Sequence, residues 1–519
     1  MVSYTITLAA LGYASQAVAA PYYEAHPERT AAVKEAFQRA WDGYYQYAFP
    51  NDTLRPISQT SENDRNGWGA SAIDALSTAL VMENQEVINL IVEYVPTINF
   101  GKTAPGQEAV SVFETTIRYM GALLSGYDFL TGPLKDLAPD EESVEALLTQ
   151  ATHLADLLSD SFDTPSGIPR NTIYITGNGT EASDDEVNGL ATIGTLILEW
   201  TRLSDLTGDP KYYELTQKAE EYLLSPLNPE LGEPFPGLVG TNVNVTTGLF
   251  VDSSGGWNGG TDSFYEYLIK MYVYDSVKFG EYLERWIAAA DSSIEYLTSH
   301  PTSRPDITFL AAYESATELN FVSTHLACFD GGSFILGGLT LDNQDYIDYG
   351  LELVNGCHET YKFTETKIGP EVFRWQDSKL ASNASNNQPP PSEWADFYSE
   401  AGFWISAGSY VLRPEVIEGF YYAYRATGDT KYQDWAWDAF VAINATTSAG
   451  VGFSAIDDVN APGGGSKSDF QESFWFAEVL KYSYLIQAED APWQVSADHN
   501  NEWVWNTEAH PVRVSGIPI

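Results

Sequence analysis

Apolar residues recur at intervals of three and four along most of the chain, which is the spacing of one face of an α-helix. In the segment 27–47, Val33, Phe37, Trp41 and Tyr44 share such a face, and Pro27 suits a first helical turn. The same pattern predicts further helices over 71–82, 110–130, 141–160, 187–206, 210–225, 262–277, 280–298, 343–361, 414–426, 430–445 and 469–487. The hydrophobic pattern therefore predicts an all-α protein.

The joints between these helices carry an internal repeat. Leu206-Thr-Gly-Asp-Pro-Lys-Tyr-Tyr closely matches Ala426-Thr-Gly-Asp-Thr-Lys-Tyr-Gln, and Leu130-Thr-Gly-Pro-Leu-Lys is a weaker copy. In each copy we expect the glycine to end a helix in a left-handed conformation. Pro210 is expected to open the next helix at its first turn. Short joints make neighbouring helices antiparallel, so the repeat predicts helical hairpins arranged in a ring or a superhelical stack.

The last stretch of the chain has a different pattern. From Trp503 to Val514 the sequence is Trp-Val-Trp-Asn-Thr-Glu-Ala-His-Pro-Val-Arg-Val, which predicts a short strand whose pairing Pro511 would stop. A chain end is normally polar and frayed, so two tryptophans indicate burial. Two interpretations stay open at this point. The segment is an edge strand packed on the core, or it fills a cavity and brings polar groups to the floor of that cavity.

Composition narrows the class of protein. The chain has 519 residues, of which 44% are hydrophobic and 13% aromatic, enough for a large core and an aromatic-lined pocket. The net charge is −46, from 72 acidic and 26 basic residues, which argues against nucleic acid or an anionic membrane as partner. It suits a protein that works in a mildly acidic medium. No composition shift divides the chain, since the helical pattern resumes directly after the Pro- and Asn-rich run 382–392, which we interpret as a loop.

Several features indicate the secretory pathway. Residues 3–20 form an apolar run that ends in Ala-Val-Ala, which predicts a signal peptide over 1–20 and a single mature domain over 21–519. Cys328 and Cys357 would pair in an oxidising compartment, although a reduced pair is the alternative. Asn-x-Ser/Thr sequons, the acceptor sites for N-glycans, occur at Asn51, Asn178, Asn244, Asn383 and Asn444. No later stretch is apolar and long enough for a membrane anchor.

Three carboxylates stand in unusual surroundings. Glu114 lies one turn before Arg118 on an apolar helical face, so their ion pair is expected to be buried and not a surface pair. Asp262 follows Gly259-Gly-Thr, where capping the next helix is the simpler interpretation. Glu415 follows Pro414 at a predicted helix start, where it would also complement the helix dipole. Each signal is weak when it is taken alone.

Taken together, the motifs resemble those of the class I α-1,2-mannosidases, glycoside hydrolase family 47, and most of all the secreted fungal branch. In chain order they are Val112-Phe-Glu-Thr-Thr-Ile-Arg, Gly260-Thr-Asp-Ser-Phe-Tyr-Glu-Tyr-Leu, Gly369-Pro-Glu-Val-Phe-Arg-Trp, Leu412-Arg-Pro-Glu-Val-Ile-Glu and Trp505-Asn-Thr-Glu-Ala-His-Pro. The resemblance runs from about Tyr23 to Val514 and includes the two cysteines. It implies an (α/α)7 barrel of helical hairpins plugged by a C-terminal β-hairpin.

The resemblance also implies a cofactor and a substrate. Thr507 would hold a Ca²⁺ ion at the barrel floor through its carbonyl and hydroxyl oxygens, with Glu478 and Glu508 orienting water ligands, because Ca²⁺ takes six to eight oxygen ligands. The substrate would be a high-mannose oligosaccharide or a glycoprotein N-glycan, from which α-1,2-linked mannose is removed. We expect a secreted monomer.

By the same resemblance the reaction is hydrolysis with inversion, in which two carboxyl groups flank the bond that is cleaved. Glu114 would be the acid, acting through a water molecule, and Glu415 the base. Asp262 is the third carboxylate, and the sequence leaves open which of the three supplies the proton. The sugar-binding residues implied are Arg118, Glu199, Gly260, Glu371, Arg413, Glu418, Phe474, Glu478 and Glu508. Phe474 would be the apolar platform for the mannose ring.

One departure bears on specificity. The endoplasmic-reticulum members carry an arginine at the place of Gly260, so its absence implies a wider pocket and the removal of several mannose residues. Two other functions remain open. One is a different helical-barrel glycosidase that needs no calcium, and the other is a non-catalytic mannose-binding protein of the same fold.

Overall fold

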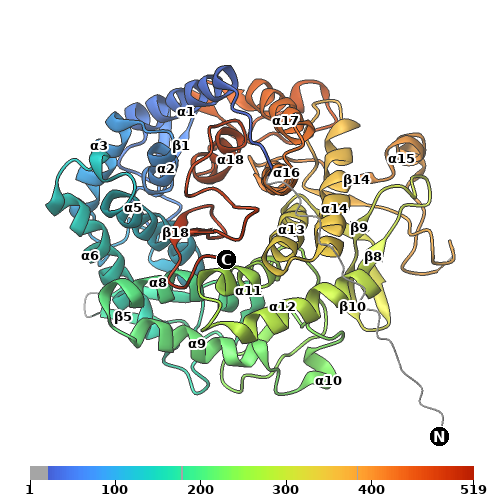
Figure 1. Cartoon of the computed structure of the whole chain (residues 1–519), viewed down its shortest axis with the longest axis horizontal. Coiled ribbons are helices and arrows are strands. Elements are labelled where there is room, and N and C mark those ends of the chain that lie inside the picture. The colour runs from blue at the N-terminus through green and yellow to red at the C-terminus, as the bar shows by residue number, and fades with distance from the viewer. Residues whose placement is uncertain (1–20, 177–178, 383) are drawn as a thin grey trace, which may run out of the picture.

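The computed structural model describes residues 21–519 except 177, 178 and 383, and it places the helices in a ring around the C-terminal end of the chain (Figure 1). The predicted signal peptide and the sequons at Asn178 and Asn383 lie outside the described residues. The inner helices are α2 (Ala70–Val81), α5 (Gly121–Thr131), α8 (Ile197–Thr207), α11 (Asp262–Tyr274), α13 (Asp330–Leu341), α16 (Glu415–Thr427) and α18 (Leu480–Leu485). Their outer partners are α3 (Gln85–Tyr94), α6 (Glu141–Leu158), α9 (Lys211–Leu224), α12 (Gly280–Ser292), α14 (Gln344–Lys362), α17 (Lys431–Thr447) and α1 (Pro27–Tyr47). The all-α prediction and the (α/α)7 barrel are confirmed.

The two rings differ in how much of each helix is buried. Every residue of α2 is buried, whereas α3 buries Val87, Ile88, Ile91 and Val92 along one stripe. A helix that is apolar all round belongs inside a protein, and an amphipathic one covers its surface. The width of the apolar face of a helix therefore indicates whether that helix lies in the inner or the outer ring. Helix α3 was not predicted because its apolar stripe is short.

Helix α13 was not predicted, because its sequence is Asp-Gly-Gly-Ser-Phe-Ile-Leu-Gly-Gly and glycine disfavours helix by about 1 kcal/mol per residue. The helix survives through close packing. A methyl group on Gly337 would lie 2.0 Å from the Trp286 ring of α12, and one on Gly331 would lie 2.9 Å from the Gly350 carbonyl of α14. Tertiary contact thus outweighs local propensity here.

Three of the predicted helices are interrupted where they border the centre of the ring. The span 187–206 divides into β6 (Val187–Gly189), α7 (Leu190–Gly194) and α8, so the prediction of one helix is wrong. The span 110–130 begins as β3 (Ala109–Ser111) and contains α4 (Val112–Glu114) and a π-helical segment, Thr115–Met120, before α5. The span 469–487 becomes helical only at a second π-helical segment, Trp475–Val479, which precedes α18.

The glycine joints are confirmed in two of three cases. Gly208 and Gly428 end their helices with φ of +72° and +67°. Gly132 has φ of −117°, so the predicted left-handed end is wrong there. The residue that follows is Pro133, and a proline disfavours a helical backbone in the residue before it. Gly132 has ψ of −121°, which lies outside both the left-handed and the extended regions.

The C-terminal hairpin fills the axis of the ring. Strands β17 (Trp503–Trp505) and β18 (Pro511–Arg513) pair in antiparallel register, Trp503 with Arg513 and Trp505 with Pro511. The expectation that Pro511 stops the pairing is therefore wrong. Proline lacks the N–H donor but is tolerated as the first residue of a strand, which is its place in β18. The interpretation of the segment as the filler of a cavity is confirmed.

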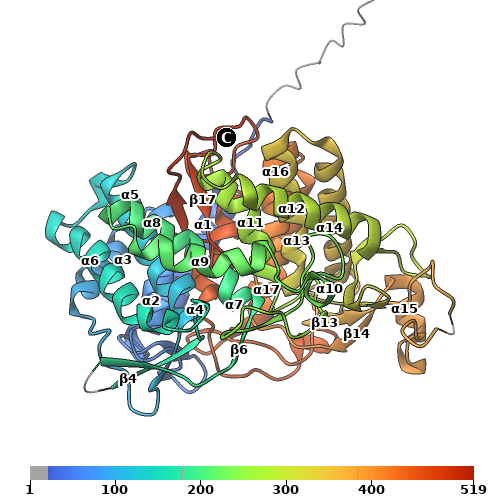
Figure 2. The same ribbon diagram turned by 90° about the horizontal axis from the view of Figure 1, so that it is seen from below.

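Short strands gather at the opposite end of the ring from the hairpin (Figure 2). They include β4 (Thr172–Thr176), β5 (Gly179–Ala182), β7 (Asn242–Asn244), β12 (Val322–Thr324), β13 (Val372–Arg374) and β14 (Trp404–Ala407). Other strands are β1 (Thr53–Arg55), β2 (Thr60–Glu62), β8 (Thr298–Ser299), β9 (Phe309–Leu310), β10 (Ala312–Ser315), β11 (Glu318–Asn320), β15 (Ser448–Ala449) and β16 (Gly452–Phe453). The shorter helical pieces are α10 (Pro229–Gly232), α15 (Ala395–Ala401), a π-helical turn at Ser293–Leu297, and 3₁₀ turns at Val95–Thr97, Lys135–Leu137, Ser159–Phe162, Leu326–Phe329, Ser392–Trp394 and Pro462–Gly464.

Cys328 and Cys357 form a disulfide with Cα atoms 5.9 Å apart, as expected. Of the sequons, Asn51 uses its side-chain amide to donate to the Ala48 carbonyl and to Ser61 Oγ, and Asn244 accepts from the Thr247 backbone N–H. Their glycosylation and that of Asn444 stay predictions. Among the described residues, no helix has the length and apolar character needed to cross a membrane.

The outer helix α9 buries a carboxyl group, that of Glu220, without a partner in the described part of the chain that would stabilise its charge. Glu220 is 1% exposed, and neither of its carboxylate oxygens has a hydrogen-bond partner among the described residues. Burial, and then the charge of Glu281, raise its pKa well above the ordinary value. Above pH 4 the unfolded chain loses this proton and the folded protein keeps it, so the free energy of unfolding decreases as pH rises towards the raised pKa.

Glu220→Met is expected to stabilise the protein, and the gain should be larger at pH 7 than at pH 4, since it removes the cost of holding the proton. Thermal unfolding at the two pH values measures this. Glu221→Met, at the exposed neighbouring position, serves as the control and should show no such pH dependence. An equal gain for Glu220→Met at both pH values would contradict a buried, protonated carboxyl group.

Candidate active site

A cavity of about 410 Å³ lies at the centre of the ring, between the strand-bearing end and the hairpin. It is lined by Glu114, Asp262 and Glu415, which are far apart in the sequence. Glu114 is the last residue of α4, whereas Asp262 and Glu415 are the first residues of α11 and α16. Because inner helices converge on the axis, carboxylates at their ends meet in one space. The expectation that Asp262 caps its helix is not met, since Thr261 occupies the N-cap position.

Two charged cavity residues lie on π-helical segments. Arg118 is in Thr115–Met120 and Glu478 is in Trp475–Val479. A π-helical turn adds one residue to a helix and re-aims the side chains that follow, and such turns are frequent at functional sites. Both segments lead into inner helices beside the hairpin, so the irregularity turns charged side chains towards the axis.

Arg118 joins the acidic side chains on one wall of the cavity. Its Nε donates to Glu114 Oε2 at 2.8 Å, and its Nη1 forms ion pairs with Glu508 Oε2 at 2.7 Å and Asp74 Oδ2 at 3.6 Å. The guanidinium also lies over the Phe474 ring, 5.6 Å from its centre. Burial alone would raise the pKa of Glu114, but Arg118 and Arg65 outweigh it and lower that pKa. The expected Glu114–Arg118 pair is thus present, with Arg118 buried and Glu114 half-buried.

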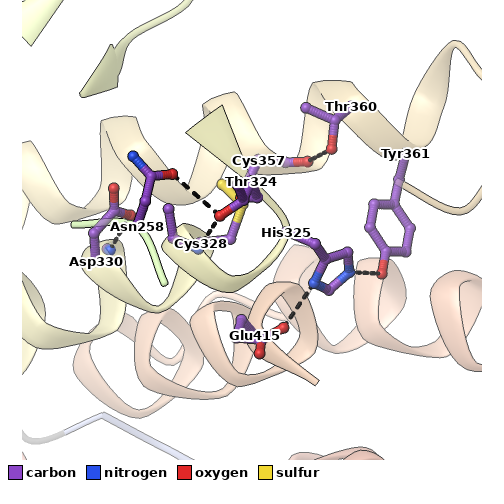
Figure 3. The surroundings of a disulfide bond; sticks show 11 residues. Asn258, Thr324, His325, Cys328, Asp330, Cys357, Thr360, Tyr361 and Glu415 are labelled. Carbon is purple, nitrogen blue, oxygen red and sulfur yellow. Dashed lines mark hydrogen bonds and ion pairs between the residues drawn. A yellow bond between two sulfur atoms is a disulfide. The ribbon is translucent and has the colours of Figure 1, made fainter. Parts of the chain in front are cut away.

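Glu415 is held by a histidine that the sequence did not single out. His325 Nδ1 lies 2.7 Å from Glu415 Oε2, and His325 Nε2 lies 2.6 Å from the Tyr361 hydroxyl (Figure 3). Burial opposes the charge on Glu415, but the hydrogen bond from His325 and the nearby Arg413 lower its pKa. Glu415 therefore carries a negative charge at mildly acidic pH.

Asp262 has the opposite electrostatic character. Its Oδ1 accepts the Ser263 backbone N–H at 2.8 Å, and no ion pair to it occurs within the described part of the chain. Burial raises its pKa to about 7, and the charges of Glu266 and Glu415 add to that effect. Of these two carboxyl groups, Glu415 is therefore ionised at mildly acidic pH, whereas Asp262 keeps its proton up to about pH 7.

Further carboxyl groups surround Thr507. Glu266, Glu418, Glu478 and Glu508 line the same cavity. Burial first, and then the charge of Glu266, raise the pKa of Glu418 to about 8, and burial also raises the pKa of Glu508 to about 8 despite Arg118. Lys270, which bonds Glu266, and Arg118 are the cationic side chains that contact this group. Carboxyl groups that crowd a cavity in this way favour the binding of a cation.

Hydrogen bonds to three other segments hold the hairpin turn that carries Thr507. Asn506 Nδ2 donates to the Ile117 carbonyl and to Glu199 Oε1, both at 2.8 Å, and the Thr507 backbone N–H donates to the Tyr267 hydroxyl at 3.3 Å. Between Trp503 and Val512, Thr507 is the residue that is not fully buried. The turn therefore presents Thr507 to the cavity from a rigid base.

Most of the expected site residues meet in the cavity. Its lining includes Glu114, Arg118, Gly260, Asp262, Arg413, Glu415, Glu418, Phe474, Glu478, Thr507 and Glu508. Glu371 stands behind this lining and binds Arg413 through two parallel contacts of 2.6 Å and 2.8 Å. Glu199 is fully buried and contacts Asn506 and Tyr267, so it supports the hairpin turn and does not line the cavity.

The sequence reasoning missed His325, Glu266 and Asp74. His325 follows a short strand in Ser-Thr-His-Leu-Ala-Cys, where no spacing marks it as functional. Glu266 lies on the same face as Asp262, one turn later, and that spacing was the available signal. Asp74 is inside a fully buried helix, so an isolated acidic residue in an apolar segment was a sign of a buried ion pair.

Comparison with known proteins agrees with this geometry. A model of the family described as glycosyl hydrolase family 47 matches residues 36–514. The chain is 53% identical to mannosyl-oligosaccharide alpha-1,2-mannosidase 1B of Aspergillus phoenicis over 99% of both chains. It is 57% identical to the mannosyl-oligosaccharide alpha-1,2-mannosidase of Penicillium citrinum over 93% of this chain and 91% of that one. Among solved structures, the alpha-1,2-mannosidase from Trichoderma reesei superposes with a TM-score of 0.92 at 51% identity and covers 95% of this chain. The chain therefore belongs to glycosyl hydrolase family 47.

Proposed function

We propose that this protein is an α-1,2-mannosidase that removes terminal α-1,2-linked mannose residues from high-mannose oligosaccharides by hydrolysis. The observation that carries the proposal is the meeting of Glu114, Asp262, Glu415 and Thr507 in one cavity, in a chain more than half identical to relatives named for this activity. The cavity also offers Phe474 as an apolar face for a sugar ring, and Arg413 lines the same cavity. A protein that only binds mannose would not need carboxyl groups in opposite protonation states.

The proposed cofactor is Ca²⁺ at Thr507. Among the described residues no three His, Cys, Asp or Glu side chains are arranged to hold a metal directly. The oxygen atoms of Thr507 would be the protein ligands, and Glu478 and Glu508 would orient water ligands around them. The crowd of carboxyl groups with raised pKa values fits a cation here, because its charge would stabilise their ionised forms. When bound, the ion supplies a positive charge that orients sugar hydroxyl groups.

For the chemistry, Glu415 is the base. It is ionised at acidic pH, and it takes a proton from the water that attacks the anomeric carbon, while the acid gives a proton to the leaving oxygen. We propose inversion, the outcome for two carboxyl groups that leave space for this water. Secretion of the enzyme as a monomer is part of the same proposal.

Two residues are candidates for the role of the general acid. The family resemblance assigns Glu114, acting through a water molecule. Its ion pair with Arg118 lowers its pKa and opposes that role. Asp262 has the raised pKa of a proton donor, about 7. The protonation states therefore favour Asp262, with Glu114 positioning Arg118 and the water.

The function is tested with a Man9 oligosaccharide. The purified protein should release free mannose, lose activity in a chelator and regain it with added calcium. Thr507→Ala should lose both the activity and the increase in melting temperature that calcium gives the wild type. Binding of the glycan without release of mannose would support the binding protein instead, and full activity in chelator would support a calcium-independent glycosidase.

The carboxylate roles are tested by substitution and pH profile. Glu415→Gln should lower kcat by at least about 10²–10⁴-fold, the usual contribution of a general base. Activity should decrease at low pH as Glu415 takes up a proton, and at high pH as the acid loses its own near pH 7. Asp262→Asn should remove the high-pH limb, and Glu114→Gln should keep it.

The opposite result for Asp262→Asn and Glu114→Gln would assign the acid to Glu114. Proton NMR of the first sugar released decides the stereochemistry. β-Mannose before mutarotation indicates inversion, whereas initial α-mannose would contradict this scheme and require a covalent nucleophile.

Specificity is tested at Gly260. Gly260 lines the cavity, and a Cβ atom there would have Thr241 Cγ2, at 3.8 Å, as its one neighbour within 4 Å among the described residues, although the φ of +94° makes a side chain strained. Gly260→Arg should narrow the products to fewer mannose residues removed, with calcium binding unchanged. Gly260→Ala carries the same backbone strain without the bulk and is the control. An unchanged product series for the arginine variant would place branch selection elsewhere.

A further inference from the structure

We infer that Tyr361 is a positioning residue for the base Glu415 and acts on it through His325. The inference rests on the proposed function, because Glu415 has the role of base only in that reaction. Tyr361 does not line the cavity, so it touches neither sugar nor attacking water. Its effect must pass through the side chain between it and Glu415.

The geometry is a linear chain of two hydrogen bonds. The His325 ring lies between the Glu415 carboxylate, 2.7 Å from Nδ1, and the Tyr361 hydroxyl, 2.6 Å from Nε2 (Figure 3). His325 is 2% exposed, Tyr361 4% and Glu415 8%. Water therefore has little access to either ring nitrogen, and the two protein groups are the hydrogen-bond partners of the imidazole.

The hydroxyl of Tyr361 supplies the donor that the unprotonated nitrogen of a neutral His325 needs. An ionised carboxylate only accepts hydrogen bonds, so His325 Nδ1 must bear the proton that it donates to Glu415. In a neutral imidazole the other nitrogen, Nε2, then has a lone pair that needs a donor, and the Tyr361 O–H supplies it. Burial and the nearby Glu415 charge raise the pKa of Tyr361 well above its ordinary value, which keeps this donor protonated. Without the hydroxyl, a buried lone pair would be left without a partner.

This arrangement determines how Glu415 presents its carboxylate. Glu415 Oε2 accepts the hydrogen bond from His325. Oε1 is therefore the carboxylate oxygen that we expect to receive the proton from water. A histidine that can rotate, or that changes its tautomer, would turn a lone pair towards the carboxylate and favour the protonated form of Glu415. The Tyr361 hydroxyl therefore acts on both the orientation and the ionisation of the base.

The disulfide and a backbone hydrogen bond hold His325 and Tyr361 in place. Cys357 is one helical turn before Tyr361 on α14, and it is bonded to Cys328, three residues after His325. The disulfide thus ties the turn that carries His325 to the helix that carries Tyr361. The His325 backbone N–H donates to the Glu371 carbonyl at 3.0 Å, which fixes the same turn to the strand beside Arg413.

The test is Tyr361→Phe, which removes one oxygen atom and keeps the ring. We expect kcat on the Man9 oligosaccharide to decrease by about 3- to 30-fold, the range for one buried hydrogen bond. KM should stay within about twofold, since Tyr361 is outside the cavity and binding is not affected. The low-pH limb of the kcat profile should move to higher pH, because a weaker donor at Nδ1 raises the pKa of Glu415.

A matched control separates positioning from folding. Tyr349 is on the same helix, is buried, and shares a hydrogen bond of 2.6 Å with Thr298 Oγ1, but it does not contact His325. Tyr349→Phe should lower the melting temperature to a similar extent and leave kcat and the pH profile unchanged. If both variants lose activity equally, the effect is on stability and the inference is wrong.

Two further measurements make the pathway specific. In a His325→Ala background, Tyr361→Phe should cause no additional loss of kcat, and an undiminished loss there would overturn the role of His325. ¹⁵N NMR of histidine-labelled protein, with the His325 signals assigned from the His325→Ala variant, should give the Nδ1-protonated tautomer in the wild type and a changed signature in Tyr361→Phe.

The NMR result is independent of turnover. If the wild type releases no mannose, the proposed function fails, and the tautomer measurement still decides whether Tyr361 controls His325. If the wild type is active and Tyr361→Phe has the wild-type kcat, pH profile and NMR signature, only the inference about Tyr361 fails.

Discussion

A closed ring of helices has an axis that no pair of neighbouring helices can fill, and the rest of this structure depends on how that axis is occupied. The C-terminal hairpin occupies it with Trp503, Val504 and Trp505, which are all buried. A side chain at Gly121 of α5 would collide with Asn506, 2.4 Å away, so the absence of one lets the turn of the hairpin reach the wall of the ring. One short segment thus completes the hydrophobic core and forms the floor of the cavity above it.

The same segment concentrates charge in a place where charge is costly. Glu508 enters the axis beside Glu478 and is met by Arg118, which also binds Glu114 and Asp74. Removing ions from water costs several kcal/mol each, which ion pairs and hydrogen bonds must offset. Here the acidic groups outnumber the cationic side chains that contact them, and burial first, with repulsion between carboxylates second, raises the pKa values of Glu418 and Glu508. This imbalance is the physical argument for the cation that we propose at Thr507, and removing that cation should lower both stability and activity.

The catalytic proposal depends on a difference between environments and not on the residue types. Asp262 and Glu415 both begin inner helices, yet His325 and Arg413 lower the pKa of Glu415, whereas burial raises that of Asp262. Tyr361 extends this control by one more side chain, from a helix that contributes nothing to the cavity lining. The disulfide between Cys328 and Cys357 lies close to both residues, so a covalent bond joins the turn that carries His325 to the helix that carries Tyr361.

The sequence alone determined the helical class and two of the three glycine joints, because spacing at three and four residues reports which helical faces are buried. The motifs around Glu114, Asp262, Glu415 and Thr507 are local, and through their resemblance to a known family they gave most of the charged residues that line the cavity. The sequence did not determine helix α13, where four glycines argue against a helix that close packing on Trp286 and Gly350 stabilises. It could not place the π-helical turns at Arg118 and Glu478, since an added residue leaves the apolar spacing almost unchanged. Only the tertiary structure brought His325 and Tyr361 to Glu415 and placed Glu199 beneath the hairpin. Those contacts join residues tens to hundreds of positions apart, and their hydrogen bonds exist only once the ring has closed.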